Sequence, residues 1–200
     1  MKKIRTITLL LLSAVLLCGC VKQSTTVTIN NNASAIVEKK LNTASASSLD
    51  SSGVIATIEQ RFIESVKKQN PVSILRYKDG EDGGIVGVIK YKNIVKEDIF
   101  ASEAFFTPNG KKNISCVTRG SETECTVDMN IEIAGADLDK FLEEQGLQYK
   151  DLDPFVLTIN LPAPAKSHNA TLFDNEQCSY IWEVPAGQKV PVNVKFSLKK

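Results

Sequence analysis

The side chains best suited to chemistry in this 200-residue sequence belong to five cysteines and a single histidine. A cysteine thiol can be acylated, oxidised to a disulfide or used as a nucleophile, and its surroundings decide between these fates. Two cysteines close an N-terminal apolar run, two lie nine residues apart in mid-chain, and one stands alone near the C-terminus: Cys18, Cys20, Cys116, Cys125 and Cys178. Each group of cysteines therefore predicts a different chemistry.

Cys20 lies at the end of a segment with the layout of a secretory signal. Three basic residues, Lys2, Lys3 and Arg5, form a cationic head. An almost uninterrupted apolar run follows over residues 7–17. This run is too short, and wrongly flanked, to span a membrane as a helix. We therefore predict that the protein is exported and that residues 1–19 are its signal peptide.

The last four residues of this segment, from Leu17 to Cys20, resemble a bacterial lipobox. The resemblance implies cleavage between Gly19 and Cys20 and a thioether-linked diacylglycerol on Cys20. Two acyl chains anchor a protein stably where one is marginal, since each buried methylene contributes about 0.8 kcal/mol. Cys18 is a poorer acceptor because two leucines, and no small residue, precede it. The alternative is an ordinary secreted protein cut near Gly19, with Cys20 as a spare thiol.

The exported part of the chain is nearly neutral. The signal peptide holds three of the 24 basic residues and none of the 23 acidic ones, which leaves 21 basic against 23 acidic residues and a formal charge of −2. Without a basic block there is no electrostatic reason to expect nucleic acid as a partner. No second apolar run approaches the ~20 residues of a membrane-spanning helix. We expect the acyl chains alone to hold the protein at the extracytoplasmic face of a bacterial cell membrane.

Cys116 and Cys125 flank a predicted β-hairpin. If Gly120 and Ser121 form a two-residue turn of type II′, counting outward along the strands places Cys116 opposite Cys125. The two then form a non-hydrogen-bonded pair, where antiparallel strands approach most closely and a disulfide can form. We predict this disulfide as a structural crosslink in an oxidising compartment, and two free core thiols are the alternative. Cys178 is left as a lone thiol, which we expect to be buried.

Alternating apolar residues predict the strands that position these side chains. The clearest alternation runs through residues 127–133, 155–161, 180–184 and 190–198. Further strands are predicted at residues 26–30, 35–40, 73–78 and 85–92, and from Ile114 onward the pattern is plainly that of β-strands. About seven to nine strands with two or three inserted helices predict an α+β domain built mainly on antiparallel β-sheet.

Three segments are predicted to be helical. Apolar residues recur at helical spacing within residues 54–68, and the weak basic face of this segment favours packing on a sheet over lying on a membrane surface. This apolar stripe consists of Ile55, Ile58, Phe62 and Val66. Asn93 is expected to cap a short helix that reaches residue 100. Asp137 is expected to cap another, which Gly146 ends.

The exported chain is predicted to form one domain over residues 26–200, joined to the membrane by the lipidated N-terminus and a tether over residues 20–25. Such a tether reaches only about 20 Å, so the domain has to lie close to the lipid surface. Residues 79–84 hold three carboxylates and three glycines between two predicted strands. Their spacing does not match a calcium-binding EF-hand loop, and we favour a solvated hairpin tip over a metal site.

The C-terminal third carries an order of elements that resembles a known family. An apolar strand at residues 156–162 ends in Leu-Pro, residues 168–170 read His-Asn-Ala, and an aromatic strand around Trp182 precedes the last strand. This order resembles the LppM-type family of bacterial lipoproteins, and residues 27–38 are similar to its first hairpin. The resemblance implies a β-rich extracytoplasmic domain beside the membrane that accommodates a lipid or another apolar ligand. Asn169 and Trp182 match the family pattern.

Asn169 and Trp182 also have purely structural explanations, a turn held by the asparagine side chain and a ring in the core. His168, the only histidine, precedes Asn169 in a predicted loop, without an identifiable nucleophile, metal-ligand cluster or phosphate-binding loop. We therefore predict a noncatalytic domain without a cofactor that binds a lipid or another apolar ligand. One alternative is an envelope module that docks a partner protein through an edge strand or apolar patch. The other is a hydrolase, which would need an acid and a nucleophile beside His168.

Overall fold

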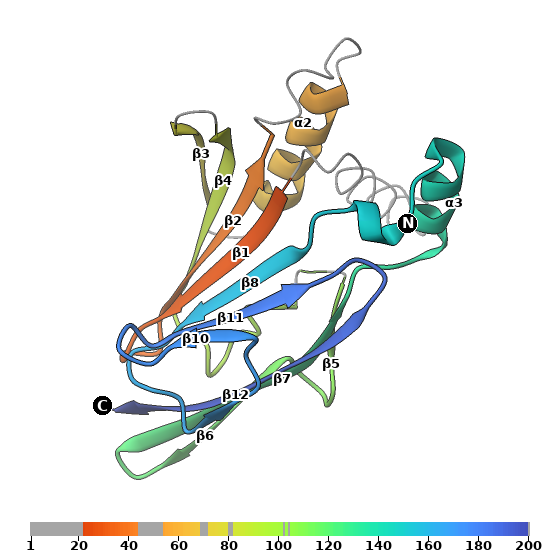
Figure 1. Ribbon diagram of the computed structural model, residues 1–200. Coiled ribbons are helices and arrows are strands. Elements are labelled where there is room, and N and C mark those ends of the chain that lie inside the picture. Colours follow the sequence, from red (N-terminus) through yellow and green to blue (C-terminus); the bar gives the residue numbers. More distant parts are fainter. Residues whose placement is uncertain are drawn as a thin grey trace.

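The computed structural model describes residues 22–43, 54–68, 72–79, 82–101, 103 and 105–199. The predicted signal peptide, Cys20 and the tip of the acidic hairpin lie outside the described residues. Two β-sheets make up most of the described structure, with two α-helices and one turn of 3₁₀ helix beside them (Figure 1). The predicted α+β class, built mainly on antiparallel sheet, is confirmed.

The larger sheet has seven strands. In spatial order they are β10 (Leu172–Asp174), β11 (Ser179–Val184), β8 (Phe155–Asn160), β1 (Lys22–Ile29), β2 (Ala35–Asn42), β4 (Asp82–Tyr91) and β3 (Val72–Asp79). Neighbouring strands run antiparallel except β1 and β8, which run parallel, with Ser24 paired to Val156. Most of the domain therefore lies in the connection between these two central strands.

The smaller sheet has five strands. Its order is β5 (Phe106–Pro108), β7 (Glu122–Glu132), β12 (Lys189–Lys199) and β9 (Ser167–His168), and β6 (Ile114–Arg119) also pairs with β7. The long β7–β12 ladder runs from Lys189 opposite Glu132 to Lys199 opposite Glu122. β11 and β12 follow each other in the chain but belong to different sheets, and they come together at the turn that joins them (Figure 1). The two sheets are therefore connected at this turn.

An aromatic core fills the space between the sheets. Tyr180 and Trp182 of β11 are completely buried. Phe155, the first residue of β8, packs edge to face against Phe105 and Phe106, with ring centroids 5.1 and 6.0 Å apart. Aliphatic and aromatic residues at the predicted alternate positions of β7, β8 and β12 are buried too: Val127, Met129, Ile131, Leu157, Ile159, Val192, Val194, Phe196 and Leu198. Removal of this apolar surface from water is the main driving force for the fold.

Helix α2 (Val54–Lys67) packs on β3 and β4. Phe62 and Val66 from the predicted apolar stripe are buried, whereas the side chains of Ile55 and Ile58 lie outside the described ones. A Cβ at Gly87 of β4 would lie only 2.5 Å from Cγ1 of Val66, so the absent side chain lets the helix approach the sheet closely. Packing of this helix on a sheet is confirmed.

Strand β1 begins at Lys22, four residues before the predicted start of the domain. Gln23 and Thr25 are polar, and for that reason the sequence pattern assigned residues 20–25 to a tether. Both side chains face the interior, where they are only 7% and 2% exposed. The boundary at residue 26 was therefore wrong, and residues 22–25 belong to the sheet.

Residues 93–100 form hydrogen-bonded turns and not the predicted short helix. Asn93 does accept a hydrogen bond from the backbone N–H of Val95 (2.9 Å). Asp98 then accepts hydrogen bonds from the backbone N–H groups of Phe100 (3.2 Å) and Asn113 (2.9 Å). These bonds tie the segment to a distant part of the chain, and Phe100 is buried. Tertiary contacts thus replace the helical hydrogen bonds that Asn93 would have initiated.

Helix α3 (Ala136–Gln145) begins one residue before its predicted cap. Its N-cap is Gly135, whose φ of +153° favours glycine, so the cap predicted at Asp137 was wrong. Gly146 ends the helix in the left-handed region with φ +66°, as predicted. A 3₁₀ turn, η2 (Tyr149–Asp151), follows. Among the described residues, the helices are too short or too polar to cross a bilayer.

Candidate functional site

Asn169 and Trp182, the two positions that match the LppM-type pattern, are in direct contact. The side-chain oxygen of Asn169 accepts hydrogen bonds from Nε1–H of Trp182 (3.0 Å) and from the backbone N–H of Asn193 (2.8 Å). Its side-chain nitrogen donates to the carbonyl of Pro191 (3.0 Å). Trp182 lies in β11, and Pro191 and Asn193 lie in β12. One asparagine side chain therefore links the two sheets.

His168 packs between two aromatic rings next to this link. Its ring centroid lies 4.6 Å from that of Phe173 and 4.8 Å from that of Tyr180. Nδ1 of His168 accepts a hydrogen bond from the backbone N–H of Ala170 (3.3 Å). The Tyr180 hydroxyl accepts one from the backbone N–H of Ala165 (2.7 Å). Among the described residues, these contacts give His168 neither the carboxylate nor the nucleophile that a hydrolase requires.

An exposed apolar surface adjoins His168 at the edge of the larger sheet. Leu172 and Phe173 of β10 are 53% and 55% exposed. Because successive side chains of a strand point to opposite faces, the two lie on either side of this edge. Phe173 shares the face of His168, and Leu172 pairs with Ile181 on the other face. We call Leu172, Phe173 and His168 the β10 surface.

The sequence did not predict the β10 surface. Residues 171–174 hold two apolar residues between a threonine and an aspartate, which is too short a pattern to identify a strand. The available signal was the position of Leu172 and Phe173 between His168 and the predicted strand at residues 180–184. Pairing of Phe173 with Tyr180 then brings its ring to His168.

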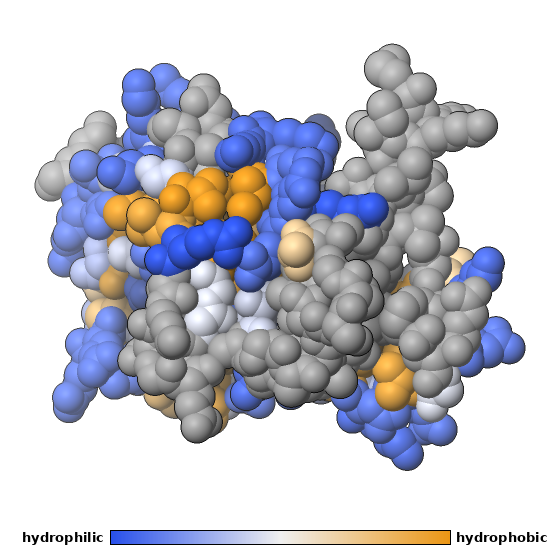
Figure 2. Space-filling view, turned by 90° about the horizontal axis from the view of Figure 1, so that it is seen from above, coloured by the Kyte–Doolittle hydropathy of each residue, from blue (hydrophilic) through white to orange (hydrophobic). Residues whose placement is uncertain are grey.

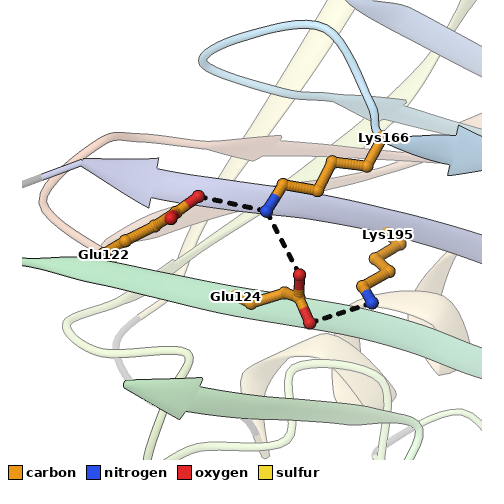
Figure 3. Close-up of polar contacts among 4 residues, drawn as sticks. All are labelled: Glu122, Glu124, Lys166 and Lys195. Atoms are coloured by element: carbon orange, nitrogen blue, oxygen red, sulfur yellow. Dashed lines mark hydrogen bonds and ion pairs between the residues drawn. The ribbon is translucent and has the colours of Figure 1, made fainter. Parts of the chain in front are cut away.

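A charged cluster holds the segment that leads into β9. The ammonium of Lys166 lies 3.1 Å from a carboxylate oxygen of Glu122 and 3.1 Å from one of Glu124, and Lys195 lies 2.9 Å from the other oxygen of Glu124 (Figure 3). Hydrogen bonds from Lys195 and then Lys166 hold the pKa of Glu124 below its usual value. Those to Glu122 and Glu124 raise the pKa of Lys166. The cluster thereby ties residue 166, three residues before Asn169, to β7 and β12.

The predicted disulfide between Cys116 and Cys125 is confirmed. The two residues are paired across β6 and β7, with their Cα atoms 4.1 Å apart. Gly120 begins the turn with φ +63°, as a type II′ turn requires. Cys178 is half-buried and not buried as expected, because it occupies the turn between β10 and β11, where its thiol donates to the carbonyl of Asn175 (3.5 Å).

The sequence also failed to predict a buried ion pair on the inner face of the larger sheet. Lys39 of β2 pairs with Glu103, and their side chains are only 7% and 10% exposed. Thr25, which lies beside Lys39 across β1 and β2, is buried as well. Lys39 lies on the same face of β2 as the buried residues Val37 and Leu41. This position at every second residue was the available signal. We assign the pair a structural role, since loss of one partner from a buried pair costs about 3–5 kcal/mol.

The part of the chain that the structure describes contains no group of three or more His, Cys, Asp or Glu side chains placed to hold a metal ion. The tip of the acidic hairpin lies outside that part of the chain. Asp79 pairs with Asp82, so the turn between β3 and β4 is shorter than the predicted six-residue tip.

Comparison with known proteins supports the fold. No protein-family model matches the chain, and no curated protein matches it in sequence. Among solved structures it is similar to the folded domain of LppM from Mycobacterium tuberculosis, determined by NMR, with a TM-score of 0.51 and 15% sequence identity. The match covers 90% of this chain and 91% of that chain. The resemblance inferred from the sequence is thus confirmed at the level of the fold.

Proposed function

We propose that this protein is a bacterial envelope lipoprotein, anchored by acyl chains on Cys20, whose noncatalytic domain binds an apolar ligand. The lipobox-like sequence from Leu17 to Cys20 supports the anchor. The likeness of the fold to the LppM folded domain supports an envelope role for the β-sheet domain. Ligand binding is supported by the β10 surface, on which two large apolar side chains remain more than half exposed.

The β10 surface is a better candidate for this ligand than the space between the sheets. Trp182, Phe155 and Phe196 are at most 1% exposed, so aromatic side chains occupy the described interior. Phe173 adjoins the ring of His168 on one face of the sheet edge, and Leu172 is exposed on the other face. Exposed large apolar side chains commonly mark a binding site. An acyl chain or another apolar group that crosses the β10 edge would cover Phe173 on one face and Leu172 on the other, and removal of these side chains from water stabilises a complex by roughly 25 cal/mol per Å² buried.

The anchor is tested by Cys20→Ser. Metabolic labelling with a radioactive or alkyne fatty acid should mark the natural protein and not the variant, and the variant should accumulate as uncleaved precursor. Cys18→Ser is the matched control and should keep both the label and the cleavage. An unlabelled natural protein, or a mature N-terminus other than residue 20, would contradict the anchor.

Ligand binding is tested with a photoactivatable diazirine fatty acid and phospholipid, and then by mass spectrometry of the adducts. We expect adducts to concentrate on residues 172–173, and Leu172→Ser to reduce their yield several-fold. Leu75→Ser is the matched control, because Leu75 is 57% exposed on β3, the opposite edge of the same sheet. Equal yields from the two variants would remove the β10 surface as the ligand site.

The second candidate is docking of a partner protein through β10. This strand ends the order of the larger sheet, and an edge strand can accept an extended segment of another chain by hydrogen bonding. A photocrosslinking amino acid at Phe173 in living cells distinguishes the two candidates. One dominant protein adduct would favour docking, whereas lipid adducts without a protein adduct would favour the apolar ligand.

A further inference from the structure

We infer that one end of the sheets, at which β1 and β12 begin, faces the bilayer and lies on its lipid head groups. We call this the membrane-facing end and define it by Lys22, Lys189, helix α3 and η2. The inference rests on the proposed acylation of Cys20. It goes beyond anchoring because it fixes which surface of the domain contacts the membrane and which surfaces point away.

The distance along the chain carries this inference. Val21 alone separates Cys20 from Lys22, the first residue of β1. Two residue steps of an extended chain span only about 7 Å. Because the acyl chains of Cys20 would lie in the bilayer, Lys22 has to lie at its surface. The predicted tether of about 20 Å would have allowed the domain to turn over, but the observed start of β1 does not.

Several elements share the membrane-facing end with Lys22. β8 runs parallel to β1, with Ser24 opposite Val156, so β8 also begins there. η2 directly precedes β8, and the hydroxyl of Tyr149 donates to the carboxylate of Asp139 in α3 (2.5 Å). A Cβ at Gly187 would lie 2.8 Å from the Tyr149 ring, so the turn between β11 and β12 packs against η2. Lys189 follows that turn.

The opposite end of the molecule lies far from these elements. β12 runs as one strand from Lys189 to Lys199, where the drawn chain ends at the other side of the molecule (Figure 1). Ten residue steps of a strand span about 33 Å. β10 pairs with residues 179–181, the half of β11 that is remote from the membrane-facing end. The β10 surface is therefore held clear of the lipid.

The character of the surface favours contact with head groups over insertion. Seen from above, hydrophilic residues form most of the surface that described residues contribute, with a broad apolar band and smaller apolar areas among them (Figure 2). Lys22 and Lys189 are exposed at this end. Charged and polar groups remain hydrated among head groups, whereas their transfer into hydrocarbon is costly.

Lys189 and Lys199 provide a matched pair of labelling sites for the test. Both are exposed lysines of β12, and each pairs with a glutamate of β7. Lys189→Cys and Lys199→Cys would be made in the full chain with Cys178→Ser, labelled with an environment-insensitive fluorophore and purified in acylated form. The proteins would be reconstituted into phosphatidylcholine vesicles that contain a lipid with a nitroxide on its head group. Nitroxide quenching reports proximity to the head groups.

We expect head-group nitroxide to quench the label at residue 189 several-fold more strongly than the label at residue 199. Equal quenching, or stronger quenching at residue 199, overturns the inference while the anchor stands. Failure of the natural protein to float with vesicles shows that the acyl anchor itself is absent. That second result contradicts the proposed function before any label is compared, so the two failures are distinguishable.

Discussion

Asn169 is the residue that joins the two sheets most directly. Its side chain contacts the indole of Trp182 in one sheet and the backbone of Pro191 and Asn193 in the other. Trp182 is completely buried, so its N–H has no access to water. A buried donor without a partner costs about 1–3 kcal/mol, and Asn169 removes this cost.

Replacement of Asn169 by alanine should destabilise the domain by about 1–3 kcal/mol, because it leaves the buried indole N–H unpaired, whereas water can replace the two exposed bonds to Pro191 and Asn193. Urea unfolding monitored by far-UV circular dichroism measures this loss. Asn169→Asp keeps the acceptor for Trp182 and should cost less. Asn31→Ala, in the exposed turn between β1 and β2, is the control and should change stability by less than about 0.5 kcal/mol. A loss at Asn169 no larger than the control would contradict the assigned role.

Two contacts at the residue scale show what a sequence can and cannot predict. The disulfide between Cys116 and Cys125 follows from one short turn, because counting outward from Gly120 fixes which residues face each other. The contact between Asn169 and Trp182 crosses from one sheet to the other. Local patterns predicted both residues as structural or ligand-binding candidates but contained no information on how the sheets pack.

At the scale of elements, α2 depends on Gly87 for its distance from the sheet. Gly87→Ala should destabilise the protein by about 1–3 kcal/mol, because the new Cβ would overlap Cγ1 of Val66. Denaturant unfolding measures the change. The double variant Gly87→Ala/Val66→Ala should be more stable than the sum of the two single changes predicts, since the smaller side chain removes the overlap. Additive effects would show that the helix moves freely and would contradict the close packing.

The charged cluster joins the segment before β9 to the β7–β12 ladder, and its contribution depends on pH. The lowered pKa of Glu124 gives a contribution that is full above the usual value of 4.5 and is lost as the pH falls through the lowered value. The raised pKa of Lys166 gives one that is full below 10.5 and is lost as the pH rises through the raised value. Between these limits the cluster therefore stabilises the junction.

Lys166→Gln should lower the free energy of unfolding slightly at pH 7, and the difference from the natural protein should shrink at about pH 2.5 and in about 1 M NaCl. The effect is small because all four side chains are exposed or half-exposed. Lys111→Gln, in the exposed loop before β6, is the control, because Lys111 is not a member of the charged cluster (Figure 3). A difference that persists at low pH and high salt would show that packing, and not charge, holds this segment.

Whole strands were predictable where the alternation of apolar and polar residues continued over many residues. β8, β11 and β12 match their predicted strands because each buries every second side chain over five or more residues. The start of β1 was missed because Gln23 and Thr25 are buried although they are polar. β10 was missed because three residues contain less than two periods. The parallel pairing of β1 and β8 had no signal in the local sequence, since it depends on the path that the chain takes between these two distant strands.

At the scale of the whole molecule, the shared core predicts that both sheets unfold together. Trp182 is the only tryptophan and lies where the sheets meet, so its fluorescence reports on their contact. We expect the fluorescence transition and the far-UV circular dichroism transition in urea to coincide. A fluorescence change at lower urea concentration would show that the sheets separate before they unfold. That result would contradict a single core.

The orientation inferred from the start of β1 changes how the candidate site has to work. The β10 surface lies on the remote half of β11, so lipid would have to leave the bilayer, or arrive from elsewhere in the envelope, to reach Leu172 and Phe173. The sequence predicted the anchor and contains the apolar residues. The sequence alone could not show that the anchor and these apolar residues lie at opposite ends of the domain, because that arrangement depends on the register of the strands in the sheet.

The parallel pairing of β1 with β8 has a consequence for the biogenesis of the protein. Residues 24–28 lie against residues 156–160, so under the proposed export the first strand to cross the membrane would have to wait for one made much later. Until then one edge of β1 offers unpaired backbone groups to any neighbouring chain. Fixing residue 20 to the membrane would keep that unfinished edge at the site of translocation, where the remainder of its own polypeptide is about to appear.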